Sequence, residues 1–205
     1  MVPKDVFTDY LKKLCPSEYQ YFITKFELYH DWLVEENKKV NLISRKTDSD
    51  DIWIYHFLDS ILPAQYYKFS NKKILDFGTG GGLPGIPISI LYPDSEMFFL
   101  DSTRKKVRLI KNLSKILGIT NCTFLNIRLE SISHEYYSSF DLILCRSVRM
   151  LPKYKKVLIN LLVEKGRIIL FKSKRLDDIK IFDAFKIHDV SISELGERNI
   201  VEITK

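Results

Sequence analysis

The stretch Asp76-Phe77-Gly78-Thr79-Gly80-Gly81-Gly82-Leu83-Pro84-Gly85 decides the fold of this chain. It follows a short apolar run at 74–77, typical of a buried strand, and precedes a helical pattern that continues to about residue 92. Glycines permit positive φ and let a ligand approach the backbone closely, at a cost of up to ~1 kcal/mol each in chain entropy. So many glycines in one turn therefore indicate a ligand site.

Two cofactor patterns fit this loop. Gly80-x-Gly82-x-x-Gly85 matches the dinucleotide fingerprint, which is weak when it stands alone. Asp-x-Gly-x-Gly at 76–80 is instead typical of doubly wound methyltransferases that use S-adenosylmethionine (SAM), and Asp76 would favour a cationic ligand. Asp101 ends the next apolar run and can accept hydrogen bonds from both ribose hydroxyls of either cofactor, or cap the following helix. The loop alone leaves SAM and NAD open.

Outward from the loop, short apolar runs alternate with amphipathic ones. Strands are predicted at 74–77, 97–101, 122–125, 140–145 and 166–171, helices at 104–117 and 151–163, and an antiparallel edge hairpin at 185–190 and 199–203. This pattern predicts an α/β fold with a doubly wound, mostly parallel, seven-stranded sheet. Ligands of such sheets lie outside the carboxyl ends of the strands.

The first 70 residues have a different texture, with helical periodicity at 16–42 and 50–66. We therefore expect an N-terminal helical extension at 1–70 and a cofactor-binding α/β domain at 71–205, which together form one structural unit. No apolar run reaches the ~18–20 residues of a membrane span, and no secretory signal pattern begins the chain. Three scattered cysteines fit neither a disulfide framework nor a zinc site, so we expect a cytoplasmic protein.

The net charge of +6 is concentrated in two blocks. Residues 102–128 hold 7 bases and no acid, and residues 146–180 hold 11 bases and 3 acids. A basic stripe is the footprint of a polyanionic partner, although a solvated helix face explains such a block equally well.

Several separated motifs together resemble the ribosomal RNA small-subunit methyltransferase G family, also called the glucose-inhibited division protein B family. They are Asn41-Leu42-Ile43, His56-Phe57-Leu58-Asp59-Ser60, the glycine loop through Pro87, Leu100-Asp101-Ser102, Lys105-Lys106-Val107, Arg128-Leu129-Glu130 and Arg146-Ser147-Val148. The resemblance spans about residues 28–172. The chain departs from the family pattern at Ser147, where alanine is usual, at Ser173, where glycine is usual, and at Cys145, where serine is usual.

The resemblance implies methyl transfer from SAM to N7 of one guanine in 16S rRNA, in the 530 loop of the decoding region (guanine 527 in the usual rRNA numbering). The cofactor contacts implied by the family and by the loop pattern are Gly78, Gly80, Leu83, Asp101, Leu129, Glu130 and Arg146. The RNA contacts expected after the fourth strand are Arg146, Arg149, Lys153, Lys155 and Lys156, because they flank the cleft. The expected partner is 16S rRNA or a small-subunit particle, and the expected state is a monomer.

The end of the fourth strand, Leu144-Cys145-Arg146-Ser147, lacks the Asp/Asn-Pro-Pro-aromatic motif of exocyclic-amine methyltransferases. Cys145 also lacks a neighbouring proline and is expected to be a core thiol, not a nucleophile. Methylation of guanine N7 needs neither that motif nor a cysteine nucleophile, because the N7 lone pair is available at neutral pH. Positioning of the two reactants can then supply most of the catalysis. We therefore expect no covalent nucleophile and no general base, and the histidines lack metal-ligand spacing, so no metal is expected.

Other interpretations remain at this stage. His56 and Asp59 share a helix face, and they either contact the cleft or, as we favour, form a hydrogen-bonded pair that docks the extension on the sheet. A nicotinamide-dependent oxidoreductase would fit the loop but lacks Tyr-x-x-x-Lys, because Leu158 stands four positions after Tyr154. The remaining alternatives are a non-catalytic RNA-binding protein and a methyltransferase for another RNA, a protein or a small molecule.

Overall fold

The computed structural model describes residues 2–205 and contains a single seven-stranded sheet. The strands are β1 (Lys73–Phe77), β2 (Glu96–Leu100), β3 (Cys122–Leu125), β4 (Phe140–Arg146), β5 (Leu162–Lys172), β6 (Lys186–Asp189) and β7 (Asn199–Thr204). Their order is β3-β2-β1-β4-β5-β7-β6, with β7 antiparallel to both β5 and β6 and the other pairs parallel. The order reverses beside β1, which places the ligand site at the carboxyl end of that strand.

Both faces of the central strands are buried, and residues along these strands alternate between the two faces. In β1, Ile74 belongs to one hydrophobic cluster, and Leu75 and Phe77 belong to the other. In β4, Leu142 and Ile143 divide between the clusters in the same way. A strand covered on both faces is apolar throughout, which explains the continuous apolar runs of the sequence.

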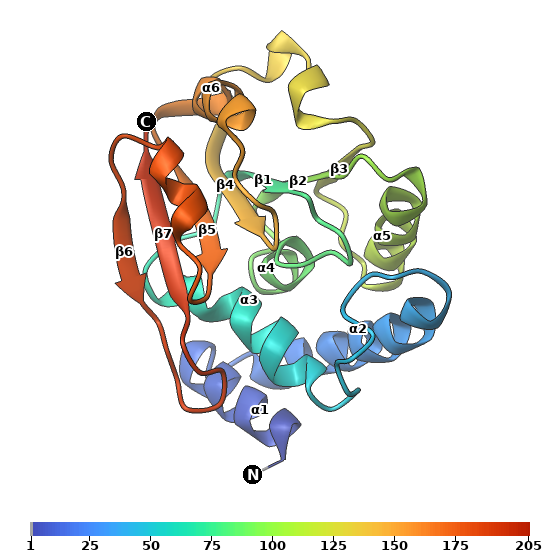
Figure 1. The fold of residues 1–205 in the computed structure, drawn as a ribbon. Coiled ribbons are helices and arrows are strands. Elements are labelled where there is room, and N and C mark those ends of the chain that lie inside the picture. The colour runs from blue at the N-terminus through green and yellow to red at the C-terminus, as the bar shows by residue number, and fades with distance from the viewer. Residues whose placement is uncertain (1) are drawn as a thin grey trace.

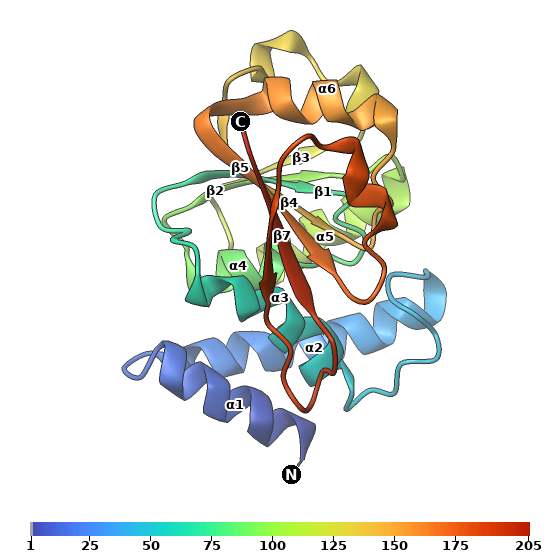
Figure 2. The ribbon, with the colours of Figure 1, turned by 60° about the vertical axis from the view of Figure 1, so that its left-hand side comes forward.

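Helices form a layer on each face (Figure 1). The helices are α1 (Pro3–Leu14), α2 (Tyr19–Lys39), α3 (Asp59–Ile61), α4 (Gly85–Leu91), α5 (Arg104–Ile116) and α6 (Pro152–Leu161). Figure 2 shows α6 above the sheet, and α4 with the three N-terminal helices below it. None of the helices described in residues 2–205 has both the length and the apolar character needed to cross a membrane.

The N-terminal extension shares one core with the lower face of the sheet. The ring centroids of Phe7 and Phe26 lie 4.7 Å apart, and those of Phe26 and Phe57 lie 5.2 Å apart. All three rings are fully buried and lie in the same cluster as Ile74 of β1 and Ile169 of β5. The extension therefore contributes directly to the packing beneath the site.

Two elements differ from the sequence prediction. The helix expected at 50–66 is a π-helical segment (Trp53–Leu58), followed by α3 and a 3₁₀ turn (Leu62–Gln65). The helix expected to reach residue 163 ends at Leu161, because β5 begins at Leu162, where it pairs with Phe140 before a register shift in β4. Periodicity alone does not distinguish π, α and 3₁₀ turns or locate a bulge.

Candidate active site: two adjoining cavities

The glycine loop bends sharply away from the end of β1. The Gly78 N–H donates to the Leu100 carbonyl at 2.8 Å, and the Gly82 N–H donates to the Thr79 carbonyl at 2.8 Å. Gly78 has φ +77°, and a Cβ there would lie 2.4 Å from Cγ2 of Val148, in the loop after β4. Only glycine allows both this backbone conformation and this close approach.

Asp101 joins the glycine loop to the start of α5. Its Oδ2 accepts the Gly80 N–H at 3.1 Å, and its Oδ1 accepts the Thr103 N–H at 2.8 Å. Each carboxylate oxygen has a second lone pair that can accept a further hydrogen bond. Asp101 therefore anchors the helix and remains able to bind a pair of hydroxyl groups, so the two roles considered from the sequence are compatible.

A cavity of about 370 Å³ opens between the glycine loop and the ends of β2 and β4. It is lined by Leu42, Phe77, Gly78, Gly80, Leu100, Asp101, Ser102, Lys106, Ile127, Arg128, Leu129, Glu130, Arg146, Ser147, Val148 and Tyr154. Six of the seven cofactor residues expected from the sequence therefore line this one cavity. The seventh, Leu83, is 5 % exposed and packs in the core below the loop instead.

Asp76 lies at the end of β1, beneath the glycine loop. The residue is fully buried outside the cavity lining, and its Oδ2 accepts the Gly85 N–H at 3.0 Å. Burial raises the pKa of Asp76 to about 6, against hydrogen bonds from Thr79 and Gly85 that lower it. Asp76 thus ties the start of α4 to β1, and any electrostatic effect it has on a cationic ligand acts from outside the cavity lining.

The extension supports the loop from below. The buried Tyr29 hydroxyl on α2 donates to the Gly81 carbonyl at 2.6 Å. Asn37 Oδ1 accepts the N–H groups of Leu42 and Ile43 at 2.8 and 3.0 Å, which fixes Leu42 against the loop and in the cavity wall. Nothing in the local sequence around Tyr29 indicates this contact, since it is one of many aromatics on an apolar helix face.

Arg146, at the end of β4, is held by Asp59 of the extension, and the same carboxylate also holds Arg198 of the loop that leads into β7. Its Nη1 donates to Asp59 Oδ2 at 3.0 Å, and Arg198 Nε donates to Asp59 Oδ1 at 3.0 Å. The side chains of Arg146 and Asp59 are 9 % and 11 % exposed. The Asp59 carboxylate thus binds two arginines, one at the end of β4 and one just before β7.

His56 completes this cluster. Arg146 Nη2 lies 3.1 Å from His56 Nδ1, and since an arginine only donates, Nδ1 accepts and the proton is on Nε2. Burial, together with the charges of Arg146 and Arg198, lowers the pKa of His56 to about 3. His56 and Asp59 do dock the extension on the sheet, but each bonds to Arg146, and the direct pair expected from the sequence is wrong.

A second cavity of about 380 Å³ lies on the other side of Arg146. It is lined by Asp59, Arg146, Ser147, Val148, Arg149, Phe171, Lys172, Ser173, Arg175, Asp177, Asp178 and Arg198. The segment from Arg146 to Val148 belongs to both cavities. Sequence reasoning missed Arg198 and Phe171. Phe171 lies near the end of β5 and Arg198 directly precedes β7, and the pairing of these two strands in the sheet brings both residues to this cavity.

The bases that follow β4 are mostly paired with acids. Arg149 lies 3.4 Å from Asp177, Lys153 lies 2.5 Å from Glu130, and Lys155 lies 2.8 Å from Asp183. Of the five residues expected to bind RNA, Arg146 and Arg149 line the second cavity, whereas Lys153, Lys155 and Lys156 are outside its lining. This part of the surface is less positive than the sequence block 146–180 suggests.

Cys145 is 2 % exposed and lies in the upper core. Burial raises the pKa of its thiol far above the usual range. The neutral, enclosed thiol is not a nucleophile for either cavity.

The strand order 3-2-1-4-5-7-6, the glycine turn after β1 and the acid after β2 define a SAM-dependent methyltransferase fold. Solved structures agree on the fold. A predicted O-methyltransferase from Agrobacterium tumefaciens matches with a TM-score of 0.60 at 13% identity, covering 72% of this chain and 80% of that one. A SAM-dependent methyltransferase from Aquifex aeolicus matches with a TM-score of 0.59 at 12% identity, covering 77% and 94%.

The model of the rRNA small subunit methyltransferase G family matches residues 22–195, and the chain belongs to that family. A ribosomal RNA small subunit methyltransferase G from Macrococcus caseolyticus is 37% identical over 150 residues, covering 72% of this chain and 63% of the relative. The protein of the same name from Christiangramia forsetii is 36% identical over 193 residues, covering 88% and 87%. The family match confirms SAM as the cofactor, and membership of a methyltransferase family does not fit the nicotinamide alternative.

Proposed function

We propose that this protein transfers a methyl group from SAM to N7 of a guanine in 16S rRNA, the guanine of the 530 loop that the family resemblance implies. The observation that supports this proposal is the pair of cavities that share the wall from Arg146 to Val148. One cavity has the residues suited to the cofactor, and the other is large enough for a base. The family match supports ribosomal RNA as the substrate class.

The residues of the first cavity fit SAM. The remaining lone pairs of Asp101 are available to the ribose hydroxyls, and Leu129 and Ile127 provide apolar surface for the adenine. Glycines at 78 and 80 leave room for a ligand against the backbone. Bound here, SAM supplies an electrophilic methyl group on a sulfonium.

The second cavity fits a flipped-out guanine. Phe171 gives an aromatic surface on which a base can stack, and Arg149 and Arg175 are positioned at the lining for the sugar-phosphate of the same nucleotide. Arg146 and Arg198 are fixed by Asp59, so the wall between the cavities is preorganised. A rigid wall holds the base in one orientation toward the first cavity.

The chemistry needs orientation more than proton transfer. The N7 lone pair forms a bond to the methyl carbon as the carbon–sulfur bond breaks, and the positive charge passes to the purine. No proton leaves the guanine, which is consistent with a neutral, buried His56 and a protonated, buried Cys145. The contribution of the chain is then to bring two bound molecules into line, which alone can supply much of the rate enhancement.

The test is to incubate the protein with methyl-labelled SAM and either small ribosomal subunits or deproteinised 16S rRNA, and to map the label. We expect label at one guanine whose ring becomes sensitive to borohydride and aniline, the signature of N7 alkylation. The Cys145→Ser variant should retain methylation. Label confined to an exocyclic amine would contradict the N7 assignment, and loss of methylation by Cys145→Ser with SAM binding intact would contradict catalysis by positioning.

A further inference from the structure

Helix α5 carries a stripe of four cations along its solvent side. Arg104, Arg108, Lys111 and Lys115 follow one another at spacings of four, three and four residues, which places them on one face of a helix. All four are exposed. At 1.5 Å per residue, the stripe extends about 16 Å.

Within residues 2–205, no acidic side chain lies within ion-pair distance of these four residues. The contrast with the region after β4 is direct, because there Arg149, Lys153 and Lys155 each have an acidic partner. Although exposed ion pairs contribute little stability, they cancel the electrostatic field that attracts a polyanion. The cations of the α5 stripe have no such partner, so their positive electrostatic field is not cancelled.

The first turn of α5 is electrostatically unfavourable for the helix itself. It begins with three consecutive bases at 104–106 and contains no acid. Cations near a helix N-terminus oppose the macrodipole by roughly 0.3–1 kcal/mol each, and Asp101 beyond the cap offsets part of this. Residues that oppose local helix preferences, and bring no compensating structural stabilisation, are expected at functional sites.

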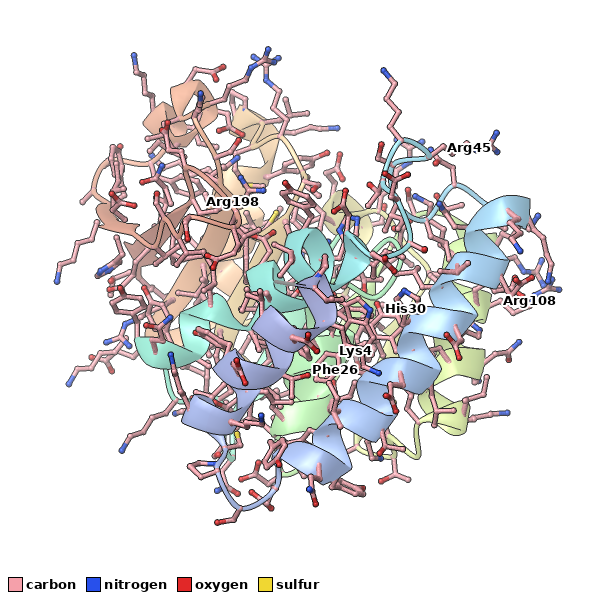
Figure 3. The ribbon with its side chains drawn as sticks, turned by 90° about the horizontal axis from the view of Figure 1, so that it is seen from below. Lys4, Phe26, His30, Arg45, Arg108 and Arg198 are labelled. Carbon is pink, nitrogen blue, oxygen red and sulfur yellow. The ribbon has the colours of Figure 1, made fainter. Side chains whose placement is uncertain are left out.

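The stripe begins at the rim of the cofactor cavity. Ser102 and Lys106, at the start of α5, both line that cavity, as does Arg128 from the segment after β3. In Figure 3, Arg108 projects outward at the flank of the molecule, and Arg45 of the loop after α2 projects on the same flank. A strand lying along α5 would therefore reach the mouth of the cofactor cavity, which shares the wall from Arg146 to Val148 with the second cavity.

We propose that the α5 stripe, and not the α6 surface, is the track on which the RNA backbone lies as its target base enters the second cavity. The choice of RNA as the polyanion rests on the proposed function, whereas the location of the track rests on the charges alone. Phosphates along the strand would contact Arg104, Arg108, Lys111 and Lys115 through ionic hydrogen bonds. Such contacts position the strand and carry no sequence information.

The test compares three double variants by fluorescence anisotropy with a labelled, guanine-containing RNA hairpin at several salt concentrations. Arg108→Gln/Lys111→Gln removes two stripe cations, and Lys155→Gln/Lys156→Gln removes two on α6. Lys180→Gln/Lys186→Gln is the matched control, since both lysines are exposed and have no ion-pair partner among the described residues. Each lost phosphate contact lowers the slope of log K against log salt by about 0.7–0.9.

We expect the stripe variant to lose about 1.4–1.8 from that slope. The other two variants should keep the slope of the unchanged protein. Equal slopes in all proteins, or a loss confined to the α6 variant, would overturn the proposal. SAM affinity by calorimetry should be the same in all of them, which excludes damage to the fold. Methylation at a position other than guanine N7 would contradict the proposed function while leaving this result unaffected.

Discussion

Asp59 and Arg198 stand 139 positions apart in the sequence and are joined by a hydrogen bond of 3.0 Å. The same carboxylate receives Arg146 at 3.0 Å, so it connects the extension, β4 and the C-terminal hairpin. Three segments that meet at one buried acid cannot move independently. The wall between the two cavities therefore depends on a residue that touches neither reacting atom.

Replacing Asp59 by asparagine should destabilise the protein by about 3 kcal/mol, because removing one partner of a buried ion pair leaves an uncompensated charge. Urea unfolding at neutral pH measures this change. The matched control is Asp177→Asn, whose pair with Arg149 is 63–76 % exposed and should contribute under about 1 kcal/mol. Equal effects of the two substitutions would show that the cluster is not a structural centre.

Acid should destabilise the protein through His56. Its pKa is about 3 in the folded protein and near 6.5 in the unfolded chain. Between these two pH values the unfolded state binds a proton that the folded state does not. Stability from this residue is complete above pH 6.5 and falls with pH by up to about 1.4 kcal/mol per unit. We expect the difference in unfolding free energy between the unchanged protein and His56→Gln to shrink from pH 7 to pH 5.

The control for this pH series is Asn112→Gln, at an exposed residue of α5 that carries no titratable group. That difference should remain constant over the same range. A constant difference for His56→Gln as well would contradict the neutral, buried state assigned to the imidazole.

Alanine at Gly78 should weaken SAM binding more than tenfold, because the new Cβ would lie 2.4 Å from Val148 and force the loop after β4 to shift. Gly196→Ala is the matched control. It has φ +67°, with nothing within 4 Å of the added atom, so it carries a similar backbone strain without a clash. Calorimetric titration with SAM should leave the control unchanged, and an equal loss in both would assign the effect to strain alone.

Tyr29→Phe should cost about 1–3 kcal/mol in unfolding free energy, since it leaves the buried Gly81 carbonyl without its donor. It should also lower SAM affinity, because the loop loses its support from α2. Tyr21→Phe, at a residue that is 61 % exposed, should change neither quantity. Stability lost without any change in SAM affinity would show that the loop holds its shape without the extension.

The sequence predicted best those features of the fold and the site that depend on local structure. The glycine loop and Asp101 follow directly from two strand ends, and the predicted hairpin at 185–190 and 199–203 is confirmed as β6 and β7. These features depend on short-range patterns, namely apolar runs and the turns that follow them.

Other features depend on contacts that no local pattern encodes. Arg146 meets Asp59 across 87 positions, and the pairing of Lys153 with Glu130 cancels charges that the sequence shows as a surplus. The π-helical segment at Trp53–Leu58 likewise has the periodicity of an ordinary helix in the sequence. Block charges therefore predicted a polyanion partner, but they could not tell which bases remain without an acid.

Asp101 links the cofactor cavity to the helix that carries the cationic stripe. Its two oxygens hold Gly80 at the cofactor cavity and Thr103 at the start of α5. A ligand that hydrogen-bonds to this carboxylate would share it with the first turn of the helix that carries the cationic stripe. Coupling between two binding equilibria is reciprocal, so any factor by which SAM changes RNA affinity must equal the factor by which RNA changes SAM affinity. The methyl donor would then act as an effector of RNA binding as well as a reactant.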